Sequence, residues 1–156
     1  MILKLLLSFN FVLNILLITV MAEEIRGQLV GGLKEQEIKI LDSVVGNGKT
    51  LWDYLQNKIE EYAKQRNSLY MYGINDIHVQ SQVVQGVLYK VTLDLAPTDC
   101  HNNKFLSEES NNARLEMIRT CSINKSHGSH EKHVIDLWVR SWLPENEKVI
   151  VSEAAH

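Results

Sequence analysis

The chain has 156 residues, enough for one domain with a buried core. Apolar residues make up 45% and charged residues 22% of the chain, a composition that excludes an intrinsically disordered protein. The formal net charge is −3 and no basic stripe runs along the chain, so the charge pattern argues against a nucleic-acid-binding protein.

Residues 1–22 have the pattern of a secretory signal peptide. Lys4 precedes an apolar run, and Val20 and Ala22 place small residues where a signal peptidase cleaves. The alternative is an uncleaved anchor helix, because the run approaches the length that spans a bilayer. Two asparagines inside the run favour cleavage. We therefore expect a mature chain of residues 23–156 that is secreted to the extracellular space and has no later membrane span.

The middle of the chain predicts one amphipathic helix. Gly46-Asn47-Gly48 is typical of a turn, and Thr50 followed by Asp53 is typical of a capped helix N-terminus. Apolar residues then recur at spacings of three and four, which places them in one stripe. We expect the helix to end near Asn67. The stripe consists of Leu51, Tyr54, Leu55, Ile59, Tyr62 and Ala63.

After the helix the apolar pattern changes to a period of two. Residues 69–81 and 87–95 predict one pair of strands, and residues 135–140 and 148–152 predict a second pair. One helix followed by two hairpins predicts an α+β fold, in which an antiparallel β-sheet holds the helix on one face. No repeat or linker indicates a second domain.

The chain has two cysteines, Cys100 and Cys121. In an oxidising compartment we expect a disulfide between them, which closes a loop of about 20 residues and stabilises the fold by about 3 kcal/mol. The alternative is a catalytic thiol beside a histidine such as His127, which needs a thiolate that stays reduced outside the cell. Asn124 begins a sequon for N-glycosylation in a polar stretch, and the sequence leaves its use open.

A run of three histidines, from His127 to His133, is a second candidate for chemistry. At three-residue spacing on a helix these side chains would suit a metal ion. Gly128 and Ser129 oppose a helix, and H-E-K-H is one residue shorter than the zinc motif H-E-x-x-H. We therefore interpret the run as a solvated loop that leads into a strand, and expect neither a metal nor another cofactor. No nucleophile motif or phosphate loop indicates an enzyme.

Both predicted hairpin turns carry apolar residues. Gln82-Val83-Val84-Gln85-Gly86 lies between the first two strands, where glycine supplies a conformation that other residues resist. The valines at this tip and Trp142 at the second tip indicate a binding surface, because exposed apolar clusters often mark contact sites. Leu29-Val30, near the mature N-terminus, is a third apolar piece and precedes two glycines.

In this order the three pieces resemble the cystatins, secreted protein inhibitors of papain-like cysteine proteases. The first tip fits the family's Q-x-V-x-G motif, Leu29-Val30-Gly31 its N-terminal trunk, and Trp142 the tryptophan of its second hairpin. The resemblance covers about residues 28–152. It implies a cystatin-like fold, with the sheet wrapped around one long helix, and a wedge that blocks the protease cleft without reacting.

The resemblance also implies a role for each residue of the wedge. Leu29 and Val30 would fill non-primed pockets of papain or a cathepsin L-type enzyme, and Gly31 would turn the chain away from the catalytic thiol. Trp142 would pack on the primed side as an amphipathic anchor. The residues that would lie above the active site are Gln82, Val83, Val84, Gln85 and Gly86, the glycine permitting close approach of the backbone.

Some cystatins carry a second site, for legumain, at an asparagine just after the helix. Asn67 occupies the matching place in this chain, followed by a serine where those inhibitors have an acid. The alternative is that Asn67 merely ends the helix, as asparagine often does.

Three departures from the family pattern affect what we expect. Ser141 replaces the proline that usually precedes Trp142, and the loop between the cysteines is longer than usual. Only one of the two disulfides of extracellular members is present, and His133 stands near the place of a missing half-cystine, so we expect a less firmly tied C-terminal hairpin. The alternative function is a non-inhibitory cystatin-fold binding or precursor module. We expect a monomer, and a domain-swapped dimer stays open.

Overall fold

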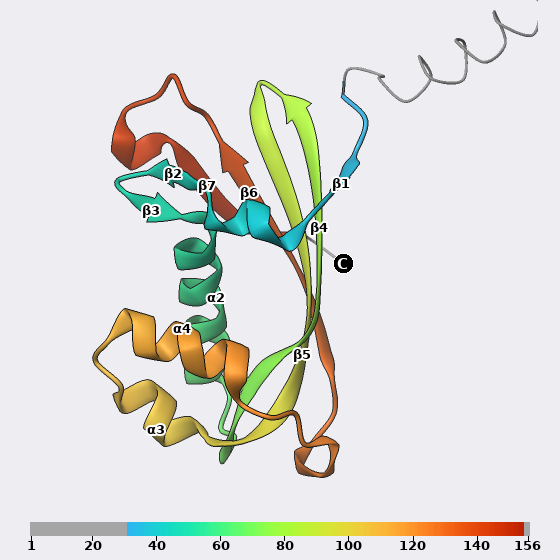
Figure 1. Cartoon of the computed structure of the whole chain (residues 1–156), viewed down its shortest axis with the longest axis vertical. Helices are drawn as coiled ribbons and strands as arrows, with labels where there is room; N and C mark the ends of the chain where they lie inside the picture. The colour runs from blue at the N-terminus through green and yellow to red at the C-terminus, as the bar shows by residue number, and fades with distance from the viewer. Residues whose placement is uncertain (1–30, 155–156) are drawn as a thin grey trace, which may run out of the picture. The chain divides into compact units, whose positions relative to one another are not determined.

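The computed structural model describes residues 31–154 of the chain. The chain divides into two units, residues 1–32 and 33–156, and every helix and strand named below lies in the second unit (Figure 1). The expected leader, Leu29 and Val30 lie outside the described residues. No helix within residues 31–154 is long and apolar enough to cross a bilayer.

Helix α2 (Leu51–Gln65) is the amphipathic helix that the sequence predicts. Its N-terminus is closed by a capping box: Asp53 N–H donates to Thr50 Oγ1 at 3.3 Å, and Thr50 N–H donates to Asp53 Oδ2 at 2.7 Å. The helix ends at Gln65, two residues before Asn67. Leu51, Leu55 and Ile59 on its inner face are buried, which confirms the predicted apolar stripe.

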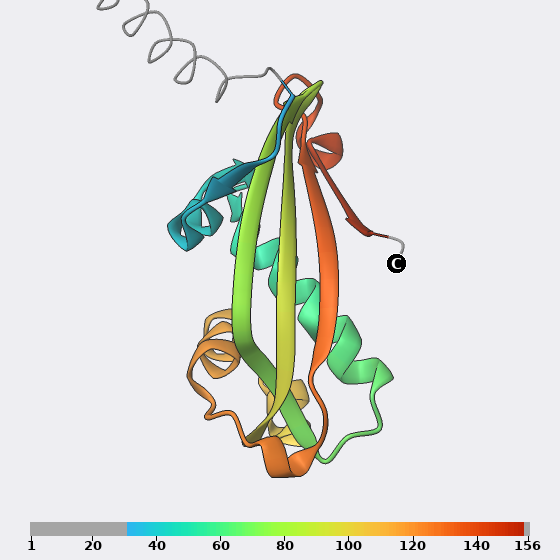
Figure 2. The same ribbon diagram turned by 90° about the vertical axis from the view of Figure 1, so that its right-hand side faces the viewer.

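Five strands form one antiparallel sheet in the order β1-β4-β5-β6-β7. The long strands curve past α2, which lies along one face of the sheet (Figure 2). This arrangement confirms the predicted α+β class. The strands are β1 (Lys34–Gln36), β4 (Tyr70–Val84), β5 (Gly86–His101), β6 (Glu131–Val139) and β7 (Val149–Glu153).

The inner face of the sheet supplies most of the core. Val91, Leu93 and Leu95 of β5 are fully buried, as the period-two pattern predicts, and Ile135 and Leu137 of β6 are buried beside them. Burial of each such side chain contributes about 1.5–3 kcal/mol. A sheet held to a helix by this many apolar contacts is a rigid support for its turns.

Two short strands, β2 (Val44–Gly46) and β3 (Lys49–Thr50), form a hairpin just before α2. A 3-10 helix, η1 (Ile38–Asp42), links this hairpin to β1. Asn47 and Gly48 at the turn have φ of 52° and 67°. Positive φ at both central residues matches the asparagine-glycine preference of two-residue hairpins, so the predicted turn is confirmed.

The segment between the two cysteines contains two helices that the sequence analysis did not anticipate. These are α3 (Asn102–Ser107) and α4 (Asn111–Thr120), and they bury Phe105 and Ile118 in the core. A disulfide joins Cys100 to Cys121 across 5.9 Å between their Cα atoms. The segment that we expected to be a long loop is therefore a packed subdomain.

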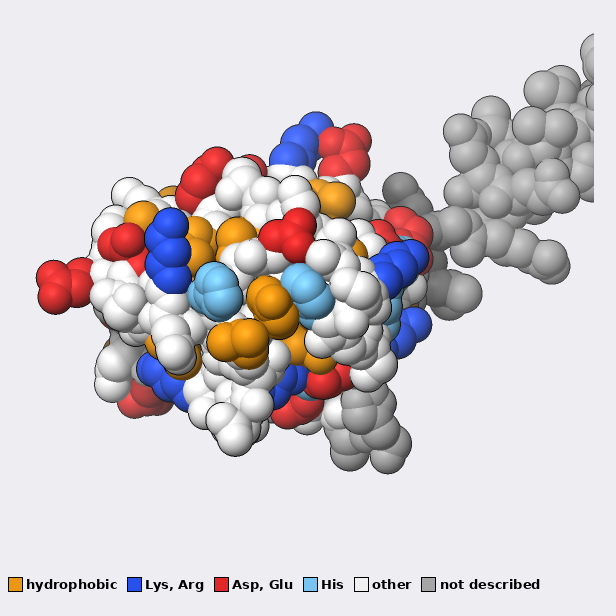
Figure 3. All heavy atoms as spheres, turned by 90° about the horizontal axis from the view of Figure 1, so that it is seen from below, with side chains coloured by type: hydrophobic (Ala, Val, Ile, Leu, Met, Phe, Trp, Pro, Cys, Tyr) orange, Lys and Arg blue, Asp and Glu red, His pale blue; other side chains and the backbone are white. Residues whose placement is uncertain are grey.

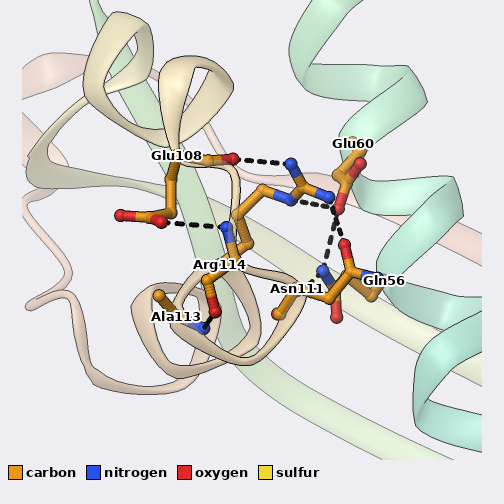
Figure 4. A network of polar contacts seen from close by, with 7 residues as sticks. Gln56, Glu60, Glu108, Asn111, Ala113 and Arg114 are labelled. Carbon is orange, nitrogen blue, oxygen red and sulfur yellow. Dashed lines mark hydrogen bonds and ion pairs between the residues drawn. The ribbon is translucent and has the colours of Figure 1, made fainter.

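A polar network holds α4 on α2 (Figure 4). Arg114 Nε of α4 lies 2.8 Å from Glu60 Oε1, and Gln56 Nε2 donates to the same oxygen at 2.9 Å. The Gln56 amide also donates to the backbone oxygen of Asn111 at 3.1 Å. Because Gln56 and Glu60 are buried, these contacts compensate groups that would otherwise lie unpaired in the interior.

Candidate functional site

The first hairpin tip lies at the end of the long β4–β5 ribbon. Gln85 alone joins the two strands, and Val84 pairs directly with Gly86. The side chains of Val83 and Val84 are 63% and 41% exposed. An apolar pair at the end of a tight hairpin, with nothing of the described chain covering it, is available to a partner.

The second tip connects β6 and β7 and carries Trp142, which is 54% exposed. Arg140 N–H donates to Lys148 O at 2.7 Å and closes the base of the turn. A 3-10 turn, η3 (Glu145–Glu147), follows Pro144 before β7 begins. This backbone bonding defines the turn although Ser141 replaces the proline of the family pattern.

The two tips lie side by side. A Cβ placed on Gly86 would come within 3.2 Å of Trp142 Cη2 and 2.3 Å of the backbone oxygen of Val139. Gly86 also has a φ of +99°, which other residues rarely adopt. Glycine at this position therefore lets the first tip approach β6 and places the Trp142 ring next to it.

The turn of the β2–β3 hairpin supports the second tip. Asn47 N–H donates to Glu145 Oε2 at 2.7 Å, and the Asn47 side chain donates to Glu145 O at 3.1 Å. Glu145 also pairs with Lys148 on the other side of the turn. Sequence reasoning missed this contact because 98 residues separate Asn47 from Glu145, and the turn motif that contains Asn47 does not indicate a distant partner.

We expect the support of the second tip to weaken in acid. The bond from Lys148 and then the Asn47 N–H lower the pKa of Glu145 below its ordinary value of 4.5. A carboxyl whose pKa is lowered by folding stabilises the folded state at pH values above its pKa in the unfolded chain. This stabilisation is lost as the pH falls through the pKa of the folded state. The difference in thermal midpoint between wild type and Glu145→Gln should therefore shrink from pH 6 to pH 3. Glu147→Gln, in the same turn, is the control, and a difference that stays constant with pH contradicts the expectation.

The trunk lies mostly outside the described residues. Gly31 has a φ of +98°, and a Cβ placed on it would meet no atom of the described residues 31–154 within 4 Å. The positive φ favours glycine at this position and agrees with a chain that turns here. The roles of Leu29 and Val30 stay predictions.

The end of the sheet opposite the tips carries a different surface. Asn67 is exposed just beyond α2, and Leu69 is 60% exposed. Tyr70 stacks between His127 and His101, with ring centroids 3.6 and 5.5 Å away. Figure 3 views this end and shows hydrophobic side chains between two histidines. The segment that follows α2 thus lies at the other end of the sheet from the two tips (Figure 2).

The three histidines of the candidate metal run point to different partners. His127 stacks on Tyr70, His130 Nδ1 lies 3.1 Å from Asp94 Oδ2, and His133 stacks on Tyr62. Within residues 31–154 no group of three or more His, Cys, Asp or Glu side chains is arranged to hold a metal.

The sequon at Asn124 lies at the start of a 3-10 turn, η2 (Lys125–His127). Its amide nitrogen, the atom that would carry a glycan, donates to Asp99 Oδ1 at 2.7 Å. Glycosylation would replace one of the two hydrogens on this nitrogen and leave one N–H as a donor. Use of Asn124 stays an open prediction.

The fold and the paired tips define a protein with an exposed apolar edge at one end of an antiparallel sheet. A family model for the Cystatin domain matches residues 43–130, more than half of the chain. The chain therefore belongs to the cystatin family, as the sequence resemblance indicates. The match includes the first tip and ends before Trp142.

Individual relatives were also found. Cystatin-1 of Chilobrachys guangxiensis is 32% identical over 88 residues, which are 56% of this chain and 59% of that protein. The chain thus spans less than two thirds of that relative. The crystal structure of Al-CPI has 18% identity and a TM-score of 0.48, and covers 80% of this chain and 96% of its own. A salivary cystatin from the soft tick Ornithodoros moubata has 18% identity and a TM-score of 0.42, with coverages of 81% and 95%.

Proposed function

We propose that this chain is a secreted, reversible, tight-binding inhibitor of papain-like cysteine proteases of the cathepsin type. Its N-terminal trunk and two hairpin loops would block the active-site cleft. The partner is a protease and the inhibitor has no catalytic role or cofactor. The organisation that goes with this function is a signal peptide over residues 1–22 and an inhibitor domain over residues 23–156.

The observation that supports the proposal most strongly is that the two exposed tips lie next to each other. Val83 and Trp142 come from hairpins almost 60 residues apart in the chain, yet the Trp142 ring lies against Gly86 of the first tip. Together they present one apolar edge on a sheet whose core holds it rigid. A rigid edge loses little conformational entropy on docking, which lets a modest contact area bind tightly.

Trunk residues complete the proposed wedge. Leu29 and Val30 would occupy the non-primed pockets, and the positive φ of Gly31 supports a turn immediately after them. Gln82 and Gln85 flank the valines and would contribute polar contacts at the rim of the interface.

The test measures inhibition by the full chain, expressed with its own leader and recovered in oxidised form from the medium. Titrated against active papain and a cathepsin L-type enzyme, the wild type should inhibit reversibly. Val83→Asp should weaken inhibition about 100-fold, because docking would bury an unpaired charge. Leu69→Asp, an equally exposed apolar position at the opposite end of the sheet, is the matched control and should inhibit like the wild type.

Other outcomes separate the alternatives. A folded, disulfide-bonded chain that inhibits neither enzyme indicates the non-inhibitory binding or precursor module. Equal loss for Val83→Asp and Leu69→Asp contradicts a contact surface at the tips. Asn67 is proposed as a separate legumain site, so inhibition of legumain should survive Val83→Asp and disappear in Asn67→Ala.

A further inference from the structure

A tryptophan on the outer face of the sheet contacts the first hairpin tip. Trp138 lies in β6 between the buried Leu137 and Val139, so its side chain points away from the core. Its indole Nε1–H donates to the backbone oxygen of Gln85 at 2.8 Å. Gln85 is the residue that joins β4 to β5, so this bond holds the turn itself rather than the strands beside it.

The Trp138 ring is in turn held from the second hairpin. The Arg140 guanidinium lies over it, 4.9 Å from the ring centroid, and donates from its Nη2 to Glu147 O at 2.8 Å. Arg140 N–H also bonds to Lys148 O at the base of that hairpin. A continuous line of contacts therefore runs from the second turn through Arg140 and Trp138 to the tip of the first.

We propose that Trp138 is a positioning residue that holds the first hairpin tip in its binding conformation. The proposal rests on the inhibitory function proposed above and adds a residue to it that would not touch the protease. Gln85 and the two valines are exposed, so their side chains do not pack the turn into the core, and the Trp138 bond adds to the strand pairing on either side of Gln85. When only a fraction of molecules has the binding-competent turn, the apparent dissociation constant rises by the inverse of that fraction.

The structure also explains why this residue escaped the sequence analysis. The strand pattern places Trp138 on the outward face of β6 with Asp136 and Arg140. Side chains on this face are expected to lie in solvent. The contact with Gln85 spans 53 residues and depends on the register that pairs Leu88 with Trp138.

The experiment compares the full chain with Trp138→Phe, which keeps an aromatic ring beneath Arg140 and removes the N–H donor. Trp52→Phe is the control, because this indole lies under Arg119 of α4 and lines a pocket with Ile74 and Ile77 of β4, several residues from the tip. Two quantities are measured: the inhibition constant for papain, and, without protease, hydrogen exchange of a peptide covering residues 82–88. Thermal midpoints of all three proteins monitor the fold.

For Trp138→Phe we expect an inhibition constant about five- to tenfold higher and exchange about fivefold or more faster at residues 82–88. The Trp52→Phe control should change neither quantity. Unchanged exchange at the tip overturns the proposal, even when inhibition weakens, because the indole would then act by direct contact. If the wild type inhibits no protease, the inhibitory function fails, while the exchange comparison still decides whether Trp138 holds the turn.

Discussion

Trp142→Ala should weaken inhibition of papain by about 2–4 kcal/mol, which is about 30- to 1000-fold in the inhibition constant. The side chain is large, amphipathic and 54% exposed, the properties of an aromatic anchor that fills a partner's pocket. The Trp142 ring lies beside Gly86 of the first tip. Truncation therefore also removes the part of the exposed apolar surface that the second tip supplies. The measurement is a titration under tight-binding conditions.

Leu69→Ala provides the matched control for Trp142→Ala. It truncates an equally exposed apolar side chain, but at the opposite end of the sheet. We expect it to leave the inhibition constant within twofold of the wild type. A loss below about 0.5 kcal/mol for Trp142→Ala would place this residue outside the interface.

The sequence predicted the elements whose signals are local. The capping box of α2 joins residues three apart, and the stripe of the helix and the alternation of β5 follow directly from their periods. The tip was predictable for the same reason, since Gly86 follows the exposed Val83 and Val84 after a single residue.

What the sequence did not predict depends on contacts between distant segments. Helix α4 has a local start signal, Ser110, whose Oγ accepts from Ala113 N–H at 3.3 Å, but its place in the fold depends on Arg114 reaching Glu60. Likewise the second tip depends on Asn47, 98 residues away from its partner. A local sequence pattern can indicate where such a helix begins. It does not indicate which distant residue the helix packs against.

The C-terminal hairpin is another example. We expected it to be less firmly tied because a second disulfide is missing. In the structure His133 Nδ1 lies 3.2 Å from Glu153 Oε1, and its ring stacks on Tyr62 at 4.0 Å. The bond from His133 is the main cause that lowers the pKa of Glu153, against the raising effect of burial. The end of β7 is therefore tied to β6 and α2 by a non-covalent contact.

Gly86→Ala should destabilise the protein by about 2–4 kcal/mol and weaken inhibition. At a φ of +99° any Cβ is strained, and here it would lie 2.3 Å from the backbone oxygen of Val139, which is fixed in β6. Relief of this overlap requires the first tip to move away from β6 and from Trp142. Chemical denaturation measures the stability, and titration against papain measures the loss of the joint edge.

Gly48→Ala is the control that separates two contributions to the loss of stability: the steric overlap of the new Cβ with Val139, and the strain of a positive φ at a residue other than glycine. Gly48 has a φ of +67°, yet a Cβ there would meet no atom of the part of the chain that the structure describes within 4 Å, so this variant should lose only about 1 kcal/mol. If Gly86→Ala costs no more than Gly48→Ala, the packing of the first tip against β6 does not require a glycine. A larger cost, together with weaker inhibition, means that Gly86 serves contacts within this chain itself, before any protease approaches.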